Sequence, residues 1–103
     1  MPIIALKITK IDSLNEIFKV YFLENKQGEL IQIVSPDQSY NAEDIVAVAL
    51  PGTKMPEFFS DGGVGYETIK AYNHYGITSH GLMLDKTDSP IGTNLNEKYG
   101  AKN

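Results

Sequence analysis

The chain has 103 residues, of which 42% are hydrophobic and 21% are charged, and its formal net charge is −4. This length and composition predict one folded globular domain with a single core. The chain contains no cysteine, which excludes disulfides, thiolate metal sites and cysteine nucleophiles. All nine basic residues are lysines, so the chain lacks the planar, bidentate contacts that arginine makes with phosphates and bases.

The first third of the chain predicts three strands. Apolar side chains alternate with other residues over 4–9 and 18–22, and an apolar run covers 30–34. Residues 25–28, "NKQG", predict a hairpin turn between the second and third strands. The second strand has three alternating apolar side chains: Phe18, Val20 and Phe22.

The middle of the chain predicts a connector and a buried strand. Residues 36–39, "PDQS", suggest a connector that holds one short helical turn. Residues 44–50 are almost continuously apolar and end at Pro51-Gly52, as expected of a strand that is buried on both faces.

The last part of the chain is richer in turn residues. Residues 53–65 read as a loop, 66–72 as a strand, 76–81 as a turn between two glycines, and 82–84 as a last short strand. The tail after residue 85 is polar, which indicates an irregular or mobile segment. Because no window keeps a helical period, five or six short strands in residues 1–85 predict a small all-β barrel or sandwich, with 86–103 as its tail.

Motifs for catalysis or metal binding are weak. His74 and His80 lack a ligand spacing, and the neighbouring side chains of Ser79 and His80 point apart on a strand or turn, which prevents proton transfer between them. The glycine-rich residues 60–65 lack the lysine and the following helix of a phosphate-binding loop. These observations predict a protein without enzymatic activity, cofactor or metal.

Aromatic residues are a stronger indication of function. Several of them gather between residues 53 and 76 near Lys54 and Lys70. Aromatic rings on a β surface can stack on bases while nearby ammonium groups contact phosphates. The aromatic residues of this segment are Phe58, Phe59, Tyr66, Tyr72 and Tyr75.

Two stretches together carry a family resemblance. "LIQIVSPDQSYNAEDIVAVALPGTKMP", followed by "IKAYNHYGITSHGLML", resembles the tRNA-binding domain at the front of the bacterial phenylalanyl-tRNA synthetase beta chain. Similar domains occur in free-standing tRNA-binding proteins and in the EMAP-type cytokine domain. The most specific match pairs "VALPG" with "GITSHGLM". The resemblance implies a five-stranded barrel of the oligonucleotide/oligosaccharide-binding (OB) fold, with a Greek-key topology.

The resemblance also implies a function and a set of contacts. It points to a module that binds tRNA or another structured RNA by shape and backbone. The absence of cysteine makes the cytoplasm the simplest expectation for its location. Tyr75 stands where the family has arginine, and His80 where it has glutamate. In this interpretation lysines meet phosphates, Ser79 donates a hydrogen bond, and ring side chains stack or hydrogen-bond; the residues concerned are Lys54, Lys70, Tyr72, Tyr75, Ser79 and His80.

A second hypothesis keeps the same fold but assigns a different function. The acidic net charge and the absence of arginine favour a protein-interaction or assembly module with little RNA affinity. In this case Phe58 and Phe59 would contact a protein partner or a second copy in a weak homo-oligomer. No segment has the length and hydrophobicity of a membrane span, so no membrane contact is expected.

Overall fold

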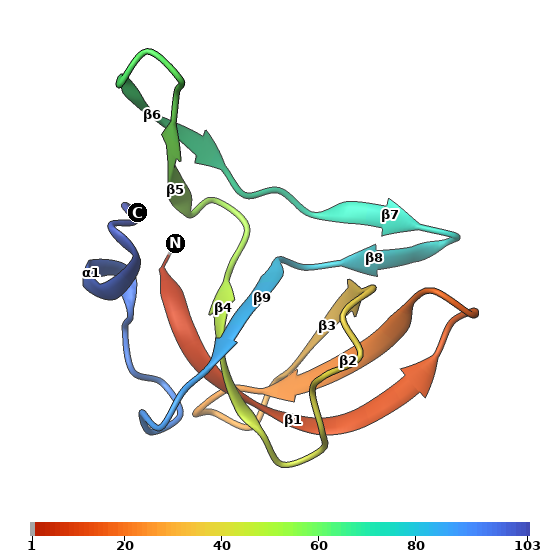
Figure 1. Cartoon of the computed structure of the whole chain (residues 1–103). Helices are drawn as coiled ribbons and strands as arrows, with labels where there is room; N and C mark the ends of the chain where they lie inside the picture. Colours follow the sequence, from red (N-terminus) through yellow and green to blue (C-terminus); the bar gives the residue numbers. More distant parts are fainter. Residues whose placement is uncertain (1) are drawn as a thin grey trace.

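Five antiparallel strands form the main sheet, in the order β3-β2-β1-β4-β9 (Figure 1). The computed structural model describes residues 2–103. The strands of this sheet are β1 (Ile3–Ser13), β2 (Lys19–Glu24), β3 (Leu30–Ser35), β4 (Ile45–Ala49) and β9 (Leu82–Lys86). The predominantly β architecture predicted from the sequence is confirmed.

Two hairpins are inserted between β4 and β9. The first consists of β5 (Lys54–Phe58) and β6 (Val64–Thr68), and the second of β7 (Tyr72–His74) and β8 (Ile77–Ser79). A short helix, α1 (Asn96–Tyr99), follows in the C-terminal tail. The structure therefore has nine strands over residues 2–103, where the sequence predicted five or six.

The main core lies on one face of the sheet. Its buried members are Leu6, Ile8, Tyr21, Leu23, Ile33, Tyr40, Val46, Val48 and Met83. Two residues of β2, Tyr21 and Leu23, belong to this core. The predicted alternation had instead grouped Phe18, Val20 and Phe22 on one face. Burial of Tyr21 is possible because its hydroxyl donates a 2.6 Å hydrogen bond to the Asp37 carbonyl oxygen.

The C-terminal tail packs on the opposite face of the sheet. The N–H of Leu95 donates to the Ile3 carbonyl (2.8 Å), and the N–H of Ile3 donates to Asn96 Oδ1 (2.7 Å). Leu95 is buried in a second cluster with Ile3, Ala5, Ala47 and Ala49. The predicted tail of 86–103 is therefore part of the same folded unit, and a boundary after residue 85 cuts through β9.

This second cluster explains the burial of β4. Val46 and Val48 face the main core, while Ala47 and Ala49 face the tail. The prediction that this strand is buried on both faces is confirmed. Its two faces differ in side-chain size, because the tail backbone approaches closely on one side only.

The connector between β3 and β4 contains no helix in residues 36–44, which corrects the predicted helical turn. The Ser39 hydroxyl and N–H both donate to the Asp37 carboxylate, at 2.7 and 2.8 Å, and they lower the pKa of Asp37. These local bonds compete with helical ones. The connector instead ends in a turn, in which the Asn41 N–H donates to Asp44 Oδ2 at 2.8 Å.

Residues 53–65 form most of the β5–β6 hairpin and not the predicted loop. Proline and glycine made this segment look irregular, but Pro56 occupies an edge position where no N–H is needed. The predicted strand over 66–72 is split correspondingly, with β6 ending at Thr68 and β7 beginning at Tyr72. The hairpin turn predicted at 25–28 is confirmed: the Gly28 N–H donates to the Asn25 carbonyl at 3.0 Å.

Candidate functional site

The β7–β8 hairpin turns at Tyr75 and Gly76. Both residues have positive φ, 53° and 87°, as a two-residue type I′ hairpin turn requires. The Gly76 N–H donates to Asn73 Oδ1 at 2.9 Å. The predicted turn over 76–81 is thus shorter than expected, because the β-branched Ile77 and Thr78 continue as a strand.

Ser79 joins this hairpin to the edge of β3. Its Oγ accepts a 3.0 Å bond from the Val34 N–H and donates to the Gly81 carbonyl at 3.3 Å. Ser79 is only 4% exposed. Its hydroxyl therefore holds two segments together inside the protein, which corrects the expectation of a donor directed at RNA.

Two further hydrogen bonds, one main-chain and one from a side chain, extend this connection between β3 and residues 78–80. The His80 N–H donates to the Gln32 carbonyl at 2.9 Å, and Gln32 Nε2 donates to the Thr78 carbonyl at 2.8 Å. Gly81 then passes close to β4, where an added Cβ would lie 2.5 Å from the Ala49 carbonyl oxygen. The hairpin is thereby fixed against the sheet on two sides.

A groove opens between this hairpin and the main sheet. Its volume is about 310 Å³. One wall comes from Phe18, Val34 and Pro36, at the ends of β2 and β3, and the other from residues 67–74. Phe18 lies 5.7 Å from the ring of His74 and 6.2 Å from that of Tyr75, measured between ring centroids. The groove thus combines aromatic rings from two separate connections of the chain.

The outer part of the groove is open to solvent and carries charge. Tyr72 is 59% exposed and Tyr75 is 74% exposed, and Lys70 lies on the groove wall with Glu67. Flat, exposed rings can stack on a planar ligand, and the Lys70 ammonium can contact an anion beside it. With one lysine and one glutamate, the groove itself has no excess of positive charge.

The predicted site residues fall into three places. Lys70 and Tyr72 line the groove, and Tyr75 contacts Phe18 beside it. Lys54 lies outside the groove at the base of the β5–β6 hairpin, and His80 belongs to another pocket. Phe18 lines the groove but was not among the predicted site residues. Its position directly after the turn at Asn15 is the signal that could have indicated a residue at the edge of the groove.

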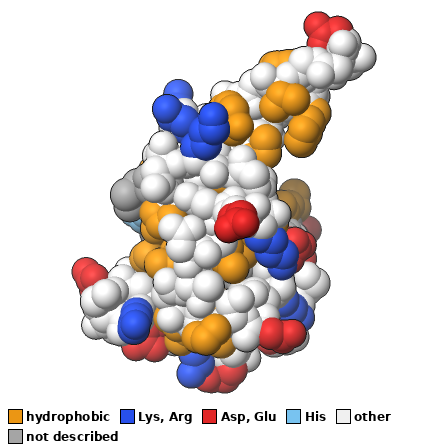
Figure 2. Space-filling view, turned by 90° about the vertical axis from the view of Figure 1, so that its left-hand side faces the viewer, with side chains coloured by type: hydrophobic (Ala, Val, Ile, Leu, Met, Phe, Trp, Pro, Cys, Tyr) orange, Lys and Arg blue, Asp and Glu red, His pale blue; other side chains and the backbone are white. Residues whose placement is uncertain are grey.

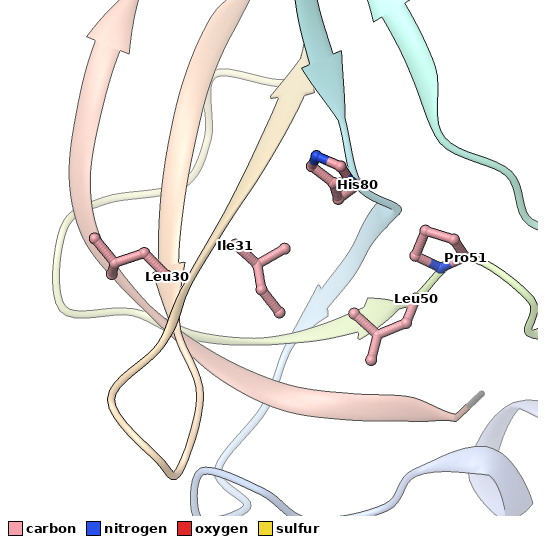
Figure 3. Close-up of a pocket in the computed structure, with 5 residues that line it drawn as sticks. All are labelled: Leu30, Ile31, Leu50, Pro51 and His80. Carbon is pink, nitrogen blue, oxygen red and sulfur yellow. The ribbon is translucent and has the colours of Figure 1, made fainter.

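The pocket that contains His80 is apolar (Figure 3). It has a volume of about 350 Å³ and is lined by Leu30, Ile31, Leu50 and Pro51 besides the histidine. A single histidine among apolar side chains provides neither a metal ligand set nor a nucleophile with its base. Across residues 2–103, no group of three or more His, Cys, Asp or Glu side chains could hold a metal ion.

Comparisons with known proteins identify no relative. No protein-family model, no curated protein and no solved structure matches the chain. Within the described part of the chain, no helix combines the length and the hydrophobicity needed to cross a membrane.

Proposed function

We propose that the chain is a non-enzymatic RNA-binding module on an OB-type barrel, related to the tRNA-binding domain of the phenylalanyl-tRNA synthetase beta chain. It takes an unpaired segment of tRNA, or of another structured RNA, into the groove between β3 and the β7–β8 hairpin. The resemblance of "VALPG" and "GITSHGLM" to that family agrees with this assignment.

Strand pairing supports the barrel. The antiparallel pairs β1–β2, β2–β3, β1–β4 and β4–β9 make β9 parallel to β3. Residues 78–80, directly before β9, hydrogen-bond to β3 through Gln32 and Val34. A five-stranded OB barrel requires this order, with its last strand returning to the third.

The position of the groove is the observation that carries the functional proposal. OB domains bind oligonucleotides on the face of their second and third strands, between the connection of strands 1 and 2 and the connection of strands 4 and 5. Here Phe18 comes from the first of these connections, and Lys70, Tyr72 and His74 come from the second. On the proposed OB barrel, the groove corresponds to the nucleic-acid-binding position, and this correspondence supports the proposal.

The chemistry of the groove favours bases over the phosphate backbone. The aromatic side chains outnumber the lysines, and the protein carries a net charge of −4. Stacking of an unpaired base on an exposed aromatic ring contributes about 1–3 kcal/mol, whatever the base. We therefore expect binding that depends on single-stranded RNA and that is weaker than that of a basic module.

A titration with bulk tRNA at two salt concentrations tests the proposal. The protein should retain tRNA in a filter or gel-shift assay at low salt, and less at high salt, because counterions compete with lysine–phosphate contacts. Tyr72→Ala should weaken binding roughly tenfold through loss of stacking. Lys26→Ala, in the β2–β3 turn away from the groove, is the control and should bind normally. Absence of retention at low salt contradicts the proposal.

A further inference from the structure

The β5–β6 hairpin projects from the body of the protein (Figures 1 and 2). Figure 2 shows hydrophobic side chains along this projection and an acidic group at its tip. Phe58 is 77% exposed, Val64 57% and Tyr66 43%. The groove does not involve these three side chains, so the proposal for RNA does not explain their exposure.

The register of the hairpin determines which main-chain groups face outward. Lys54 exchanges two hydrogen bonds with Lys102, at 2.8 and 2.9 Å, so its N–H and C=O point away from β6. In an antiparallel pair the outward direction recurs at every second residue of each strand. On β6, the partners of Lys54, Pro56 and Phe58 have the same orientation: Thr68, Tyr66 and Val64.

The two edges of the hairpin differ as a result. On the edge of β5, the C-terminal tail already hydrogen-bonds to the main chain of Lys54, and Pro56 has no N–H that could donate a hydrogen bond. The edge of β6 is open: over residues 2–103, no other segment hydrogen-bonds to the main chain of Val64, Tyr66 or Thr68. An open strand edge is a template for pairing with another strand.

We propose that a second copy of this chain pairs with this edge, β6 against β6 in antiparallel orientation, around a two-fold axis at Tyr66. In this register Tyr66 lies opposite Tyr66 of the other copy, and Val64 lies opposite Thr68. The outward N–H and C=O groups of these three residues form the new hydrogen bonds. The result is a four-stranded sheet that the two copies share.

Charge and residue type are compatible with this register. Glu67 lies opposite Gly65 of the other copy, so like charges do not face each other across the axis. Val64 meets a β-branched threonine, and the two tyrosines form a cross-strand aromatic pair, which is a favourable combination. The same strand therefore complements itself, as a two-fold interface requires.

The size of the contact indicates a weak dimer. Tyr66 is the aromatic residue of β6, and even a fully buried aromatic side chain covers only about 150–250 Å². A stable interface covers about 800 Å² per partner. The association should consequently depend on protein concentration in the micromolar to millimolar range.

Sedimentation velocity over a concentration series tests the dimer and its register. Val64→Lys with Thr68→Lys places like charges opposite each other twice and should leave the protein monomeric at concentrations where the wild type dimerises. Val64→Lys with Thr68→Glu places opposite charges there and should restore dimerisation, with a dissociation constant within about tenfold of the wild type. Within one chain, position 68 lies opposite Lys54 on β5, so a lysine there meets a like charge and a glutamate meets an opposite one. Thermal unfolding of both variants at a concentration where each is monomeric measures this intrachain effect separately from dimerisation.

Amide hydrogen exchange gives a second readout that needs no substitution. The amides of Val64, Tyr66 and Thr68 should become protected as concentration rises, while those of Gly65 and Glu67, which face β5, should be protected throughout. A wild type that stays monomeric at millimolar concentration overturns the proposal, as does equal dimerisation of the two double variants. Both experiments are done without RNA, so their outcome is independent of the proposed RNA binding.

Discussion

The Val34 N–H donates a hydrogen bond to Ser79 Oγ at 3.0 Å, across 45 positions of sequence. This bond links the β7–β8 hairpin to β3 in the interior, beside the bond from Gln32 Nε2 to the Thr78 carbonyl. Since both the groove and the return of the chain to β3 depend on this contact, it connects the fold to the proposed site.

Removal of the Ser79 hydroxyl should destabilise the protein. Ser79→Ala leaves the buried Val34 N–H without its acceptor, and an unsatisfied buried donor costs about 1–3 kcal/mol. Urea unfolding measures this loss. Thr78→Ala, one position earlier on β8, is the control and should change the free energy of unfolding by less than about 0.5 kcal/mol. Equal effects of the two substitutions would contradict the role assigned to Ser79.

Alanine substitutions at Gly81 and Gly62 distinguish the cost of steric crowding from the cost of an unfavourable backbone conformation. Both have positive φ, 128° and 87°, but a Cβ at Gly81 would lie 2.5 Å from the Ala49 carbonyl oxygen, whereas a Cβ at Gly62 meets nothing within 4 Å. Gly62→Ala should therefore cost about 1 kcal/mol, from the backbone alone. Gly81→Ala should cost about 3 kcal/mol or more, because β9 must move away from β4. Thermal unfolding of both variants measures the two losses of stability. Losses of similar size would contradict the predicted difference between the two positions.

Truncation of Leu95 tests whether the tail belongs to the domain. Leu95 is 8% exposed and packs against Ile3 and Ala5. Leu95→Ala should lower the free energy of unfolding by about 2–3 kcal/mol, as expected for a buried leucine. Lys98→Ala, on the exposed side of α1, should have little effect. A variant as stable as the wild type would show that the tail does not contribute to stability.

Stability should decrease in alkaline solution. Burial, and then the charge of Asp37, raise the pKa of Tyr21, and burial raises that of Tyr40. Because the folded state holds these protons more tightly, the contribution to stability is fully present below the unfolded value of about 10 and is lost as pH rises through the folded pKa. Urea unfolding between pH 8 and 11 measures this loss. Tyr21→Phe should reduce the slope of stability against pH, and an unchanged slope is the contrary result.

The strands of the main sheet could be predicted because their side chains follow local rules. The apolar run of β4 and the turn at Gly28 require no knowledge of distant residues. Tyr21 is an exception, since its burial depends on the Asp37 carbonyl, sixteen positions away. Alternation alone could not identify that acceptor.

The β5–β6 hairpin and the tail escaped prediction for the same reason. Gly65 reads as a loop residue, but it lies under the ring of Phe59, where an added Cβ would be 2.9 Å from the ring edge. Leu95 is one apolar residue in a polar segment, and its partner Ile3 is at the other end of the chain. Both depend on tertiary contacts that override local composition.

The candidate site was partly predicted. Lys70, Tyr72 and Tyr75 are exposed at or beside the groove, as their aromatic and basic character suggested. Ser79 resembled an exposed loop residue because it stands between small polar neighbours, but its hydroxyl bonds to the β3 backbone. Phe18 comes to the groove only through the pairing of β2 with its neighbours, which sequence spacing does not reveal.

Amide NMR of labelled protein titrated with bulk tRNA at low salt tests the RNA proposal most directly. If the groove binds RNA, the signals of Phe18, Lys70, Tyr72, His74 and Tyr75 should shift or broaden as RNA is added, and those of α1 should stay unchanged. If tRNA at saturating concentration leaves the groove signals where they are, or perturbs only the β5–β6 hairpin, the groove is not an RNA-binding site.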